Sequence, residues 1–282
     1  MNCTICSDRN YKVIFIKNGY PILQCMECNH LFTEYEPSPH DVEKIYSDNY
    51  FFTGGAGYDN YILEGDMLIK RGEYYADKIS KYIKPGKVLD IGSAAGFILK
   101  GFENKGWEGT GIELNKSMVE YGRQKLGINL LQGAIETAEL DEKFDLIILI
   151  QVVAHLYDLN DSLRKISGFL KPDGLILIET WNKDSWTSKI FGRHWHEYSP
   201  PSTLNYFSKK TLDLFLNQQK FFLVNRGTPT KKILSKHAKS LIKYKYHGTA
   251  VFNLLSGLIK LIPDNILLPY PSEDLFWALY KK

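Results

Sequence analysis

The sequence lacks the features that would place it in several large classes of protein. All four cysteines fall between Cys3 and Cys28 and none follows, which excludes a disulfide framework spanning the chain. No run of about 18 apolar residues is present, so we expect no membrane span, and the N-terminus has no apolar signal region. These absences predict a cytoplasmic protein. The formal net charge of +3 gives no indication of a nucleic-acid partner.

The few cysteines form one pattern, two Cys-x-x-Cys pairs with eighteen residues between them. Each pair turns two thiolates toward one point, and two pairs complete a tetrahedral site. Between them, alternating segments flank Asn18-Gly19, which predicts a hairpin. A mononuclear iron centre and an empty site are the alternatives to zinc, and we expect His30 at the surface. The pattern predicts a zinc ribbon over residues 1–36, with a structural Zn²⁺ held by Cys3, Cys6, Cys25 and Cys28.

A second absence concerns nucleotide motifs. The chain has no Gly-Lys-Ser/Thr, so it has no nucleotide P-loop, and its glycine spacing differs from the dinucleotide Gly-x-Gly-x-x-Gly. What is present is a buried strand at Lys87–Ile91, a turn containing Gly92 and Gly96, and a helix from Phe97. Glycines let the backbone approach a ligand closely. A strand, a tight turn and a helix N-terminus form a ligand-binding unit of α/β sheets.

The chain downstream of this turn alternates between strands and helices. The predicted strands are 109–114, 128–132, 144–151, 175–180, 221–228 and 274–280. Such alternation predicts a parallel sheet with right-handed crossovers. Glu113 ends the second strand, 23 residues after Asp90. An acid at this place accepts hydrogen bonds from both ribose hydroxyls of an adenosine ligand.

At Asp90–Gly96, Glu113, Phe144–Ile150 and Lys171–Gly174 the chain resembles the class I S-adenosylmethionine (SAM)-dependent methyltransferases. The resemblance covers roughly residues 66–228 and implies an α/β fold with a Rossmann-like seven-stranded sheet. Ala94 replaces the middle glycine of the family motif, and we expect a negative φ there, where a methyl group is tolerated. The residues implied to bind SAM are Asp90, Gly92, Ser93, Ala94, Gly96, Phe97, Glu113, Leu114, Gly133, Ala134, Ile135 and Gln151.

Strand four is followed by a stretch that resembles the family's Ile-Glu-His-Leu, with Ala154 in place of the glutamate. His155 matches the family's histidine beside the methyl group. We predict that His155 is the general base, ahead of His194 and His196, because an imidazole near its free pKa can accept the acceptor's proton. The alternative is a structural histidine that caps the strand.

The long connection 181–207 is also informative, because loops of this length in a compact domain are usually functional. It resembles that of a bacterial methyltransferase subgroup with an N-terminal zinc ribbon. Thr203 stands where that subgroup has a histidine, so the role of that histidine does not transfer.

Two further segments are predicted with open alternatives. Residues 37–65 form a linker in which glycines 54, 55 and 57 lie among aromatic residues, and it either packs on the main domain or acts as a lid. The methyltransferase domain is expected over 66–282, with a basic helical insertion at 229–271 whose apolar face includes Leu234, Ala238, Leu241 and Ile242. This insertion is predicted to cap the active site, to contact an anionic membrane peripherally or to pack as an ordinary helix.

Taken with the resemblance, these features predict a SAM-dependent methyltransferase acting on a small molecule, a sugar or a glycan precursor. One alternative is an rRNA methyltransferase with a zinc-binding N-terminus, which the balanced charge of the ribbon disfavours. Another is a non-catalytic SAM-binding scaffold, which four replacements keep open: Ala94, Ala154, Thr203 and Ala134, the last at a place where the resemblance implies an acid that bonds the adenine. The sequence leaves open the acceptor, the methylated atom and the oligomeric state.

Overall fold

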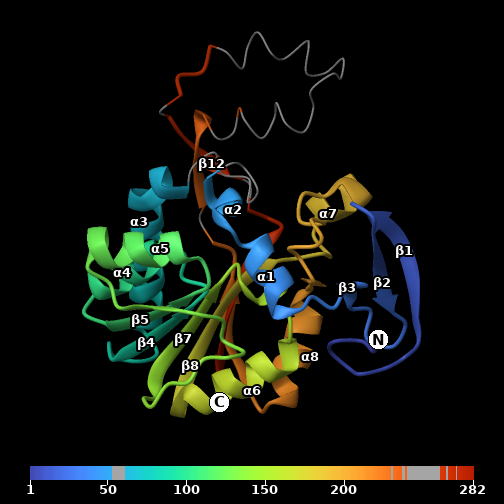
Figure 1. Ribbon diagram of the computed structural model, residues 1–282, viewed down its shortest axis with the longest axis horizontal. Coiled ribbons are helices and arrows are strands. Elements are labelled where there is room, and N and C mark those ends of the chain that lie inside the picture. The colour runs from blue at the N-terminus through green and yellow to red at the C-terminus, as the bar shows by residue number, and fades with distance from the viewer. Residues whose placement is uncertain (53–60, 230, 237–238, 240–260, 265, 271) are drawn as a thin grey trace.

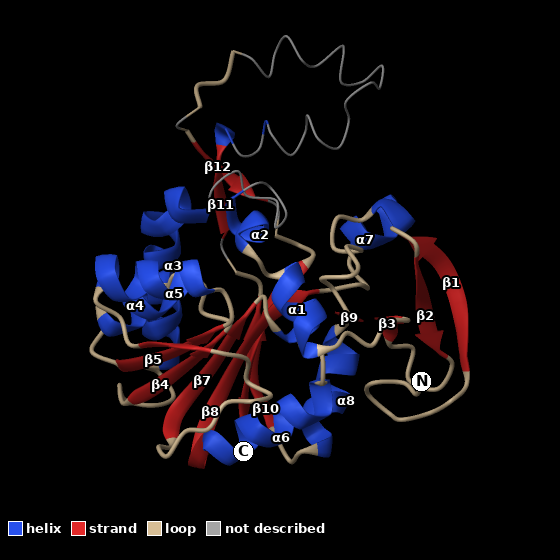
Figure 2. Ribbon diagram, viewed as in Figure 1, coloured by secondary structure: helices blue, strands red, loops and turns tan. Residues whose placement is uncertain are grey.

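A seven-stranded mixed sheet forms the centre of the protein (Figures 1 and 2). The computed structural model describes residues 1–52, 61–229, 231–236, 239, 261–264, 266–270 and 272–282. The strand order is β10 (Phe222–Gly227), β13 (Leu275–Lys281), β8 (Leu170–Trp181), β7 (Phe144–Ile150), β4 (Lys87–Ile91), β5 (Glu108–Glu113), β6 (Leu130–Gln132). Strand β13 runs antiparallel to both of its neighbours, β10 and β8, and the pairs from β8 to β6 are parallel. The predicted seven-stranded α/β fold is confirmed.

Helices cover both faces of this sheet because its strands are apolar on both faces. Leu146 and Ile148 pack toward one face, and Ile147 and Leu149 toward the other. The first face is covered by α3 (Gly65–Ile79), α4 (Phe97–Glu103), α5 (Lys116–Tyr121) and the π-helical turn η2 (Gly122–Leu126). The second is covered by α6 (Leu159–Phe169) and α8 (Lys209–Gln218) (Figure 2).

Strand β4 lies at the point where the strand order reverses, with β5 on one side and β7 on the other. Open α/β sheets bind their ligands outside the carboxyl ends of the strands at such a switch point. The short elements η1 (Tyr61–Glu64) and η3 (Val153–His155) precede α3 and follow β7 in the chain. The fold therefore places the turn after β4 where a ligand is expected.

The cysteine-rich N-terminus forms a small sheet that a segment of the main domain completes. Its strands β1 (Tyr11–Lys17) and β2 (Tyr20–Cys25) form the predicted hairpin, with Asn18 and Gly19 at φ +49° and +85°. Strand β3 (Leu31–Thr33) pairs with β2 on one side and with β9 (Asn205–Tyr206) on the other. Strand β9 belongs to the long connection, which also contains α7 (Trp186–Phe191) and η4 (Gly192–His194).

The core of this small sheet is continuous with the core of the main domain. Leu23 and Phe32 belong to the same cluster of buried side chains as Leu149. On the other face, Ile22 and Leu31 pack with residues of the long connection, among them Trp195. The N-terminal sheet is therefore built into the molecule through both of its faces.

The insertion at 229–271 differs from its prediction at its base. Strand β11 (Lys231–Leu234) pairs antiparallel with β12 (Leu267–Tyr270), so the placement of Leu234 on a helix is wrong. The pairing partner lies more than thirty residues away, and helical periodicity cannot reveal such a partner. Ala238, Leu241 and Ile242 lie outside the described residues. Among the residues described, no helix is long and apolar enough to cross a membrane.

Candidate functional site

The turn after β4 begins with a glycine that no other residue could replace without strain. Gly92 has φ +68°, and a Cβ built on it would lie 2.6 Å from Val152 Cγ2. The backbone amides of Gly92 and Ser93 both donate to the Ile112 carbonyl, at 2.8 and 3.1 Å. Gly96, at φ +80°, is the N-cap of α4. The loop is therefore tied to β5 before it enters the helix.

The backbone of Ala94 differs from its prediction. Its φ is +47°, so the expected negative φ is wrong. The Ala94 amide donates to Glu113 Oε2 at 2.8 Å, and this bond orients the peptide toward the neighbouring strand end. A left-handed backbone costs an L-residue roughly 1–2 kcal/mol. The loop retains the conformation of a glycine position although the residue is alanine.

Two buried carboxyl groups meet at this loop. Asp90 and Glu113 are 3% and 6% exposed, and burial raises the pKa of both. Glu113 Oε1 accepts from the Asn115 amide at 2.7 Å. No residue within the described part of the chain donates a hydrogen bond to the Asp90 carboxyl. Two acids without a cationic side chain fit a ligand that brings hydroxyl donors or positive charge.

The remaining predicted cofactor residues surround the same strand ends. Leu114 is half-buried directly after Glu113. Gly133 has φ +152° in the turn after β6, Ala134 is half-buried and Ile135 is 2% exposed. The next residue, Glu136, accepts from Ser162 Oγ on α6 at 2.9 Å. Phe97 is buried at the start of α4, between the rings of Tyr61 and Tyr121.

Gln151, the residue after β7, joins a buried polar network. Its side-chain amide donates to Glu179 Oε1 at 3.0 Å, and its backbone amide donates to the Glu179 carbonyl at 2.8 Å. Arg71 and Tyr75 of α3 also donate to the Glu179 carboxylate, which is completely buried. This network fixes the carboxyl ends of β7 and β8 to each other and to α3.

His155 lies in η3, four residues beyond Gln151, and its ring is held by one hydrogen bond. Its Nδ1 lies 2.7 Å from the Ser202 carbonyl oxygen. A carbonyl only accepts, so Nδ1 carries the proton and Nε2 is the basic atom of the neutral ring. Burial lowers the pKa of His155 below 6.5, and the bond to Ser202 opposes this shift. The neutral imidazole is the form suited to accept a proton.

A segment that sequence reasoning placed only in a linker crosses this site. It joins α1 (Pro39–Ile45) to α2 (Asp48–Phe52) (Figure 1). The Tyr46 hydroxyl donates to the same Ser202 carbonyl at 3.0 Å, and its ring packs edge-on against His155. On the other side, Asn115 Nδ2 donates to the Tyr46 carbonyl and to Asp48, both at 3.0 Å. Residues 46–48 thus bridge the ends of β5 and β7.

The other histidines of interest lie elsewhere. His194 is exposed in η4, and His196 packs edge-on against Trp181. The prediction of a surface position for His30 is wrong, because its side chain is fully buried and Nε2 lies 3.2 Å from Asn205 Oδ1. Apolar packing against Phe32 and Phe207 accounts for this burial.

The four cysteines converge although no disulfide joins them. Their Sγ atoms all lie within 4.8 Å of one another. Cys3 and Cys28 are 3.6 Å apart, and Cys6 and Cys25 are 3.5 Å apart. In a tetrahedron with Zn–S bonds of about 2.3 Å, neighbouring sulfurs lie about 3.8 Å apart. The separations therefore fit one four-coordinate metal.

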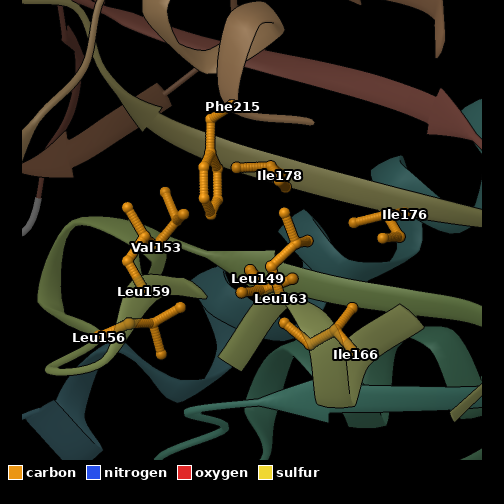
Figure 3. A pocket seen from close by; sticks show the side chains of 9 residues that line it. All are labelled: Leu149, Val153, Leu156, Leu159, Leu163, Ile166, Ile176, Ile178 and Phe215. Carbon is orange, nitrogen blue, oxygen red and sulfur yellow. The ribbon is translucent and has the colours of Figure 1, made fainter. Parts of the chain in front are cut away.

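An enclosed apolar space lies beneath η3, between the sheet and helices α6 and α8 (Figure 3). Its volume is about 10 Å³, and carbon atoms alone line it, including those of Val153, Leu156 and Phe215. A space of this size holds at most about one water molecule. It is a small packing defect on the second face of the sheet and is too small for a ligand.

Comparison with known proteins gives the class to which this fold and loop belong. Residues 67–224 match the family described as a methyltransferase domain, and the chain belongs to this family. The solved structure of a possible histamine N-methyltransferase from Thermotoga maritima shares the fold, with a TM-score of 0.55 at 15% identity over 86% of this chain and 99% of that one.

Proteins that are similar to this chain in sequence include ubiquinone biosynthesis O-methyltransferases. The one from Rickettsia typhi is 29% identical over 204 residues, which are 69% of this chain and 76% of the relative. The one from Rickettsia felis is 28% identical over 121 residues, which are 40% of this chain and 50% of the relative. The chain thus spans about half the length of most of these relatives. The N-terminal cysteine sheet lies outside the family match.

Proposed function

We propose that the protein is a SAM-dependent methyltransferase that acts on a hydroxyl group of a small molecule. One observation carries this proposal: the buried carboxyl groups of Asp90 and Glu113 meet the Gly92–Gly96 loop at the switch point of the sheet. The ubiquinone biosynthesis O-methyltransferases among the relatives support a small-molecule acceptor over rRNA. Sugars and glycan precursors remain within the proposed class.

The residues of the site fit SAM. When bound, SAM supplies an electrophilic methyl group on a sulfonium centre. Glu113 would accept from the ribose hydroxyls, and its orientation is fixed by the backbone amides of Ala94 and Asn115. A cationic ligand would favour the ionised form of the buried Asp90 carboxyl. Ile135 and Leu114 would offer apolar contact for the adenine. The side chain of Gln151 is oriented at the end of β7 by its hydrogen bond to Glu179.

His155 is proposed as the general base. Its neutral ring, with the proton on Nδ1 directed to Ser202, leaves Nε2 to accept the proton of the acceptor hydroxyl. Such proton transfer contributes about 100- to 10,000-fold to the rate. Tyr46 would exclude water from this side of the site. The phenol stays protonated because burial and the nearby Tyr50 and Glu113 raise its pKa.

We further propose that Cys3, Cys6, Cys25 and Cys28 hold one structural Zn²⁺, as in a zinc ribbon over residues 1–36. The sulfur separations support four thiolate ligands, which leave no open position for a substrate. Burial raises the pKa of the Cys3 thiol to about 11, and a bound cation would favour the thiolate at neutral pH.

The proposed function is tested by incubating the protein with methyl-labelled SAM and a panel of catechols, phenols and sugars. We expect transfer of label to at least one hydroxyl acceptor, together with tight binding of S-adenosylhomocysteine (SAH). Binding of SAH without turnover on any member of the panel would favour the non-catalytic scaffold. Absence of both binding and turnover would refute the proposal.

A further inference from the structure

We propose that the N-terminal cysteine sheet positions the catalytic base, with Thr33 of β3 as the positioning residue. The sheet would act through the backbone of residues 202–204, which holds His155. This inference rests on the proposed function, because it takes His155 as the base. It gives the N-terminal sheet a role in catalysis in addition to its role in folding.

The first step is the contact between His155 and the long connection. The Ser202 carbonyl accepts from His155 Nδ1 at 2.7 Å, and the Leu204 amide donates to the Ala154 carbonyl at 2.9 Å. The segment 202–204 thus bonds to two adjacent residues of η3, Ala154 and His155. They fix both the backbone before the imidazole and the tautomer of the ring itself.

The second step is the attachment of this segment to β3. Thr33 Oγ1 donates to the Thr203 carbonyl at 2.9 Å, and the Thr33 amide donates to the Leu204 carbonyl at 2.9 Å. Thr33 is 3% exposed, so these bonds do not compete with water. Thr33 therefore orients the two peptide planes that follow the Ser202 carbonyl.

Other residues reinforce the attachment. The Tyr206 hydroxyl donates to the Thr203 carbonyl at 3.1 Å and also lies 3.1 Å from Thr33 Oγ1. Asn205 Oδ1 accepts from Thr4 Oγ1 at 2.7 Å, and the backbone of Asn205 pairs with Phe32. The segment that supports His155 is thus held by residues from both ends of the N-terminal sheet. Thr203 stands where the resembled subgroup has a histidine, and it contributes its backbone carbonyl as the acceptor for Thr33 and Tyr206.

The test compares two variants. Thr33→Val removes the hydroxyl and keeps the branched shape, whereas Thr33→Ser keeps the hydroxyl and removes the methyl group. Thr110→Val is the matched control, since Thr110 is also a buried threonine. Among the described residues, its hydroxyl bonds to Asn129 alone, accepting from Nδ2. Two readouts are used: the tautomer of His155 from ¹⁵N NMR of the cofactor-free protein, and kcat against the KM for SAM.

We expect Thr33→Val to populate both tautomers of His155 and to lower kcat, by up to about 100-fold, with the KM for SAM within twofold of wild type. Thr33→Ser should restore the single tautomer and most of the rate, and Thr110→Val should change neither. If Thr33→Val keeps the wild-type tautomer and kcat, the inference is wrong.

If Thr33→Val fails to fold, as judged by circular dichroism, Tyr206→Phe makes the same test with a smaller change. It removes the hydroxyl that contacts Thr203 and keeps the ring. A wild-type tautomer and kcat in Tyr206→Phe would then overturn the inference. The NMR readout needs no acceptor, so a failure of the proposed methyl transfer would not be mistaken for a failure of positioning.

Discussion

Ala94 carries a backbone conformation that glycine adopts at no steric cost. Its φ is +47°, and its amide is held by Glu113. We predict that Ala94→Gly stabilises the protein by up to about 1 kcal/mol, because the relief of left-handed strain exceeds the added entropy of the unfolded chain. Urea denaturation of both proteins measures this difference.

The neighbouring alanine provides the control for this prediction. Ala95 is fully buried in the same loop, and its φ is not positive. Ala95→Gly should therefore destabilise the protein by roughly 0.5–1 kcal/mol. An equal loss of stability in both variants would show that Ala94 is not strained.

His155 gives a second prediction at the scale of the residue. His155→Asn should lower kcat by about 100- to 10,000-fold and leave the affinity for SAM unchanged, since the asparagine amide has no basic nitrogen. Steady-state kinetics and calorimetry measure the two quantities. His194→Asn is the control and should behave as wild type, because His194 is exposed in η4. Turnover within a few-fold of wild type would assign His155 a structural role.

The protonation of His155 also predicts the pH dependence of the rate. Only the neutral ring can accept a proton, and burial lowers its pKa below 6.5. The rate should therefore fall as the pH is lowered, with a midpoint below 6.5. A plot of kcat against pH checks this, and a midpoint above 6.5 would contradict the burial of the ring.

At the scale of the element, the cysteine sheet gives a prediction about metal removal. We expect one zinc ion per chain by elemental analysis, and a lower melting temperature after chelation or in Cys25→Ser, because metal binding supplies folding free energy to a small sheet. Met26→Ser, at an exposed neighbour of Cys25, is the control and should keep both metal and stability. Iron in place of zinc, or protein without stoichiometric metal, would contradict the zinc assignment.

The sequence predicted those elements whose signals are local. Alternating strands and helices predicted the parallel part of the sheet, and the resemblance to the methyltransferases implied its seven strands. The Asn18-Gly19 turn predicted the hairpin before Cys25. Leu234 was misplaced because its strand partner is distant in sequence. The pairing of β3 with β9 was also missed. The two strands are distant in sequence, and a two-residue pairing leaves no periodic signal.

Within the candidate site, side chains were easier to predict than backbone groups. Asp90, Glu113 and His155 were predicted as site residues from the strand ends and from the resemblance to the methyltransferases. The Ser202 carbonyl was missed, because any residue has a carbonyl and its identity carries no information. Tyr46 was noted only among linker aromatics, although its hydroxyl reaches the same carbonyl. The positive φ of Ala94 was not predicted, because it accompanies a hydrogen bond to Glu113 on another strand and the local sequence around Ala94 does not reveal that bond.

At the scale of the whole molecule, the small sheet reaches the site through residues 202–204, which bond to η3 after β7. The large sheet supplies the loop and the two acids, and the small sheet supports the connection that holds His155. Residues 46–48 link the two sides. We propose that this site binds SAM and its product, and the roles proposed for Glu113 and His155 depend on that binding.

Calorimetric titration with SAH tests this claim most directly. The variant is Glu113→Ala, and the control is Glu108→Ala at the opposite, exposed end of the same strand. Glu113→Ala should weaken binding by roughly 10- to 150-fold, the equivalent of a lost charge-assisted bond of about 1.5–3 kcal/mol, while Glu108→Ala should bind as wild type does. Equal affinity of all three proteins for SAH, or no binding by any of them, would contradict the account.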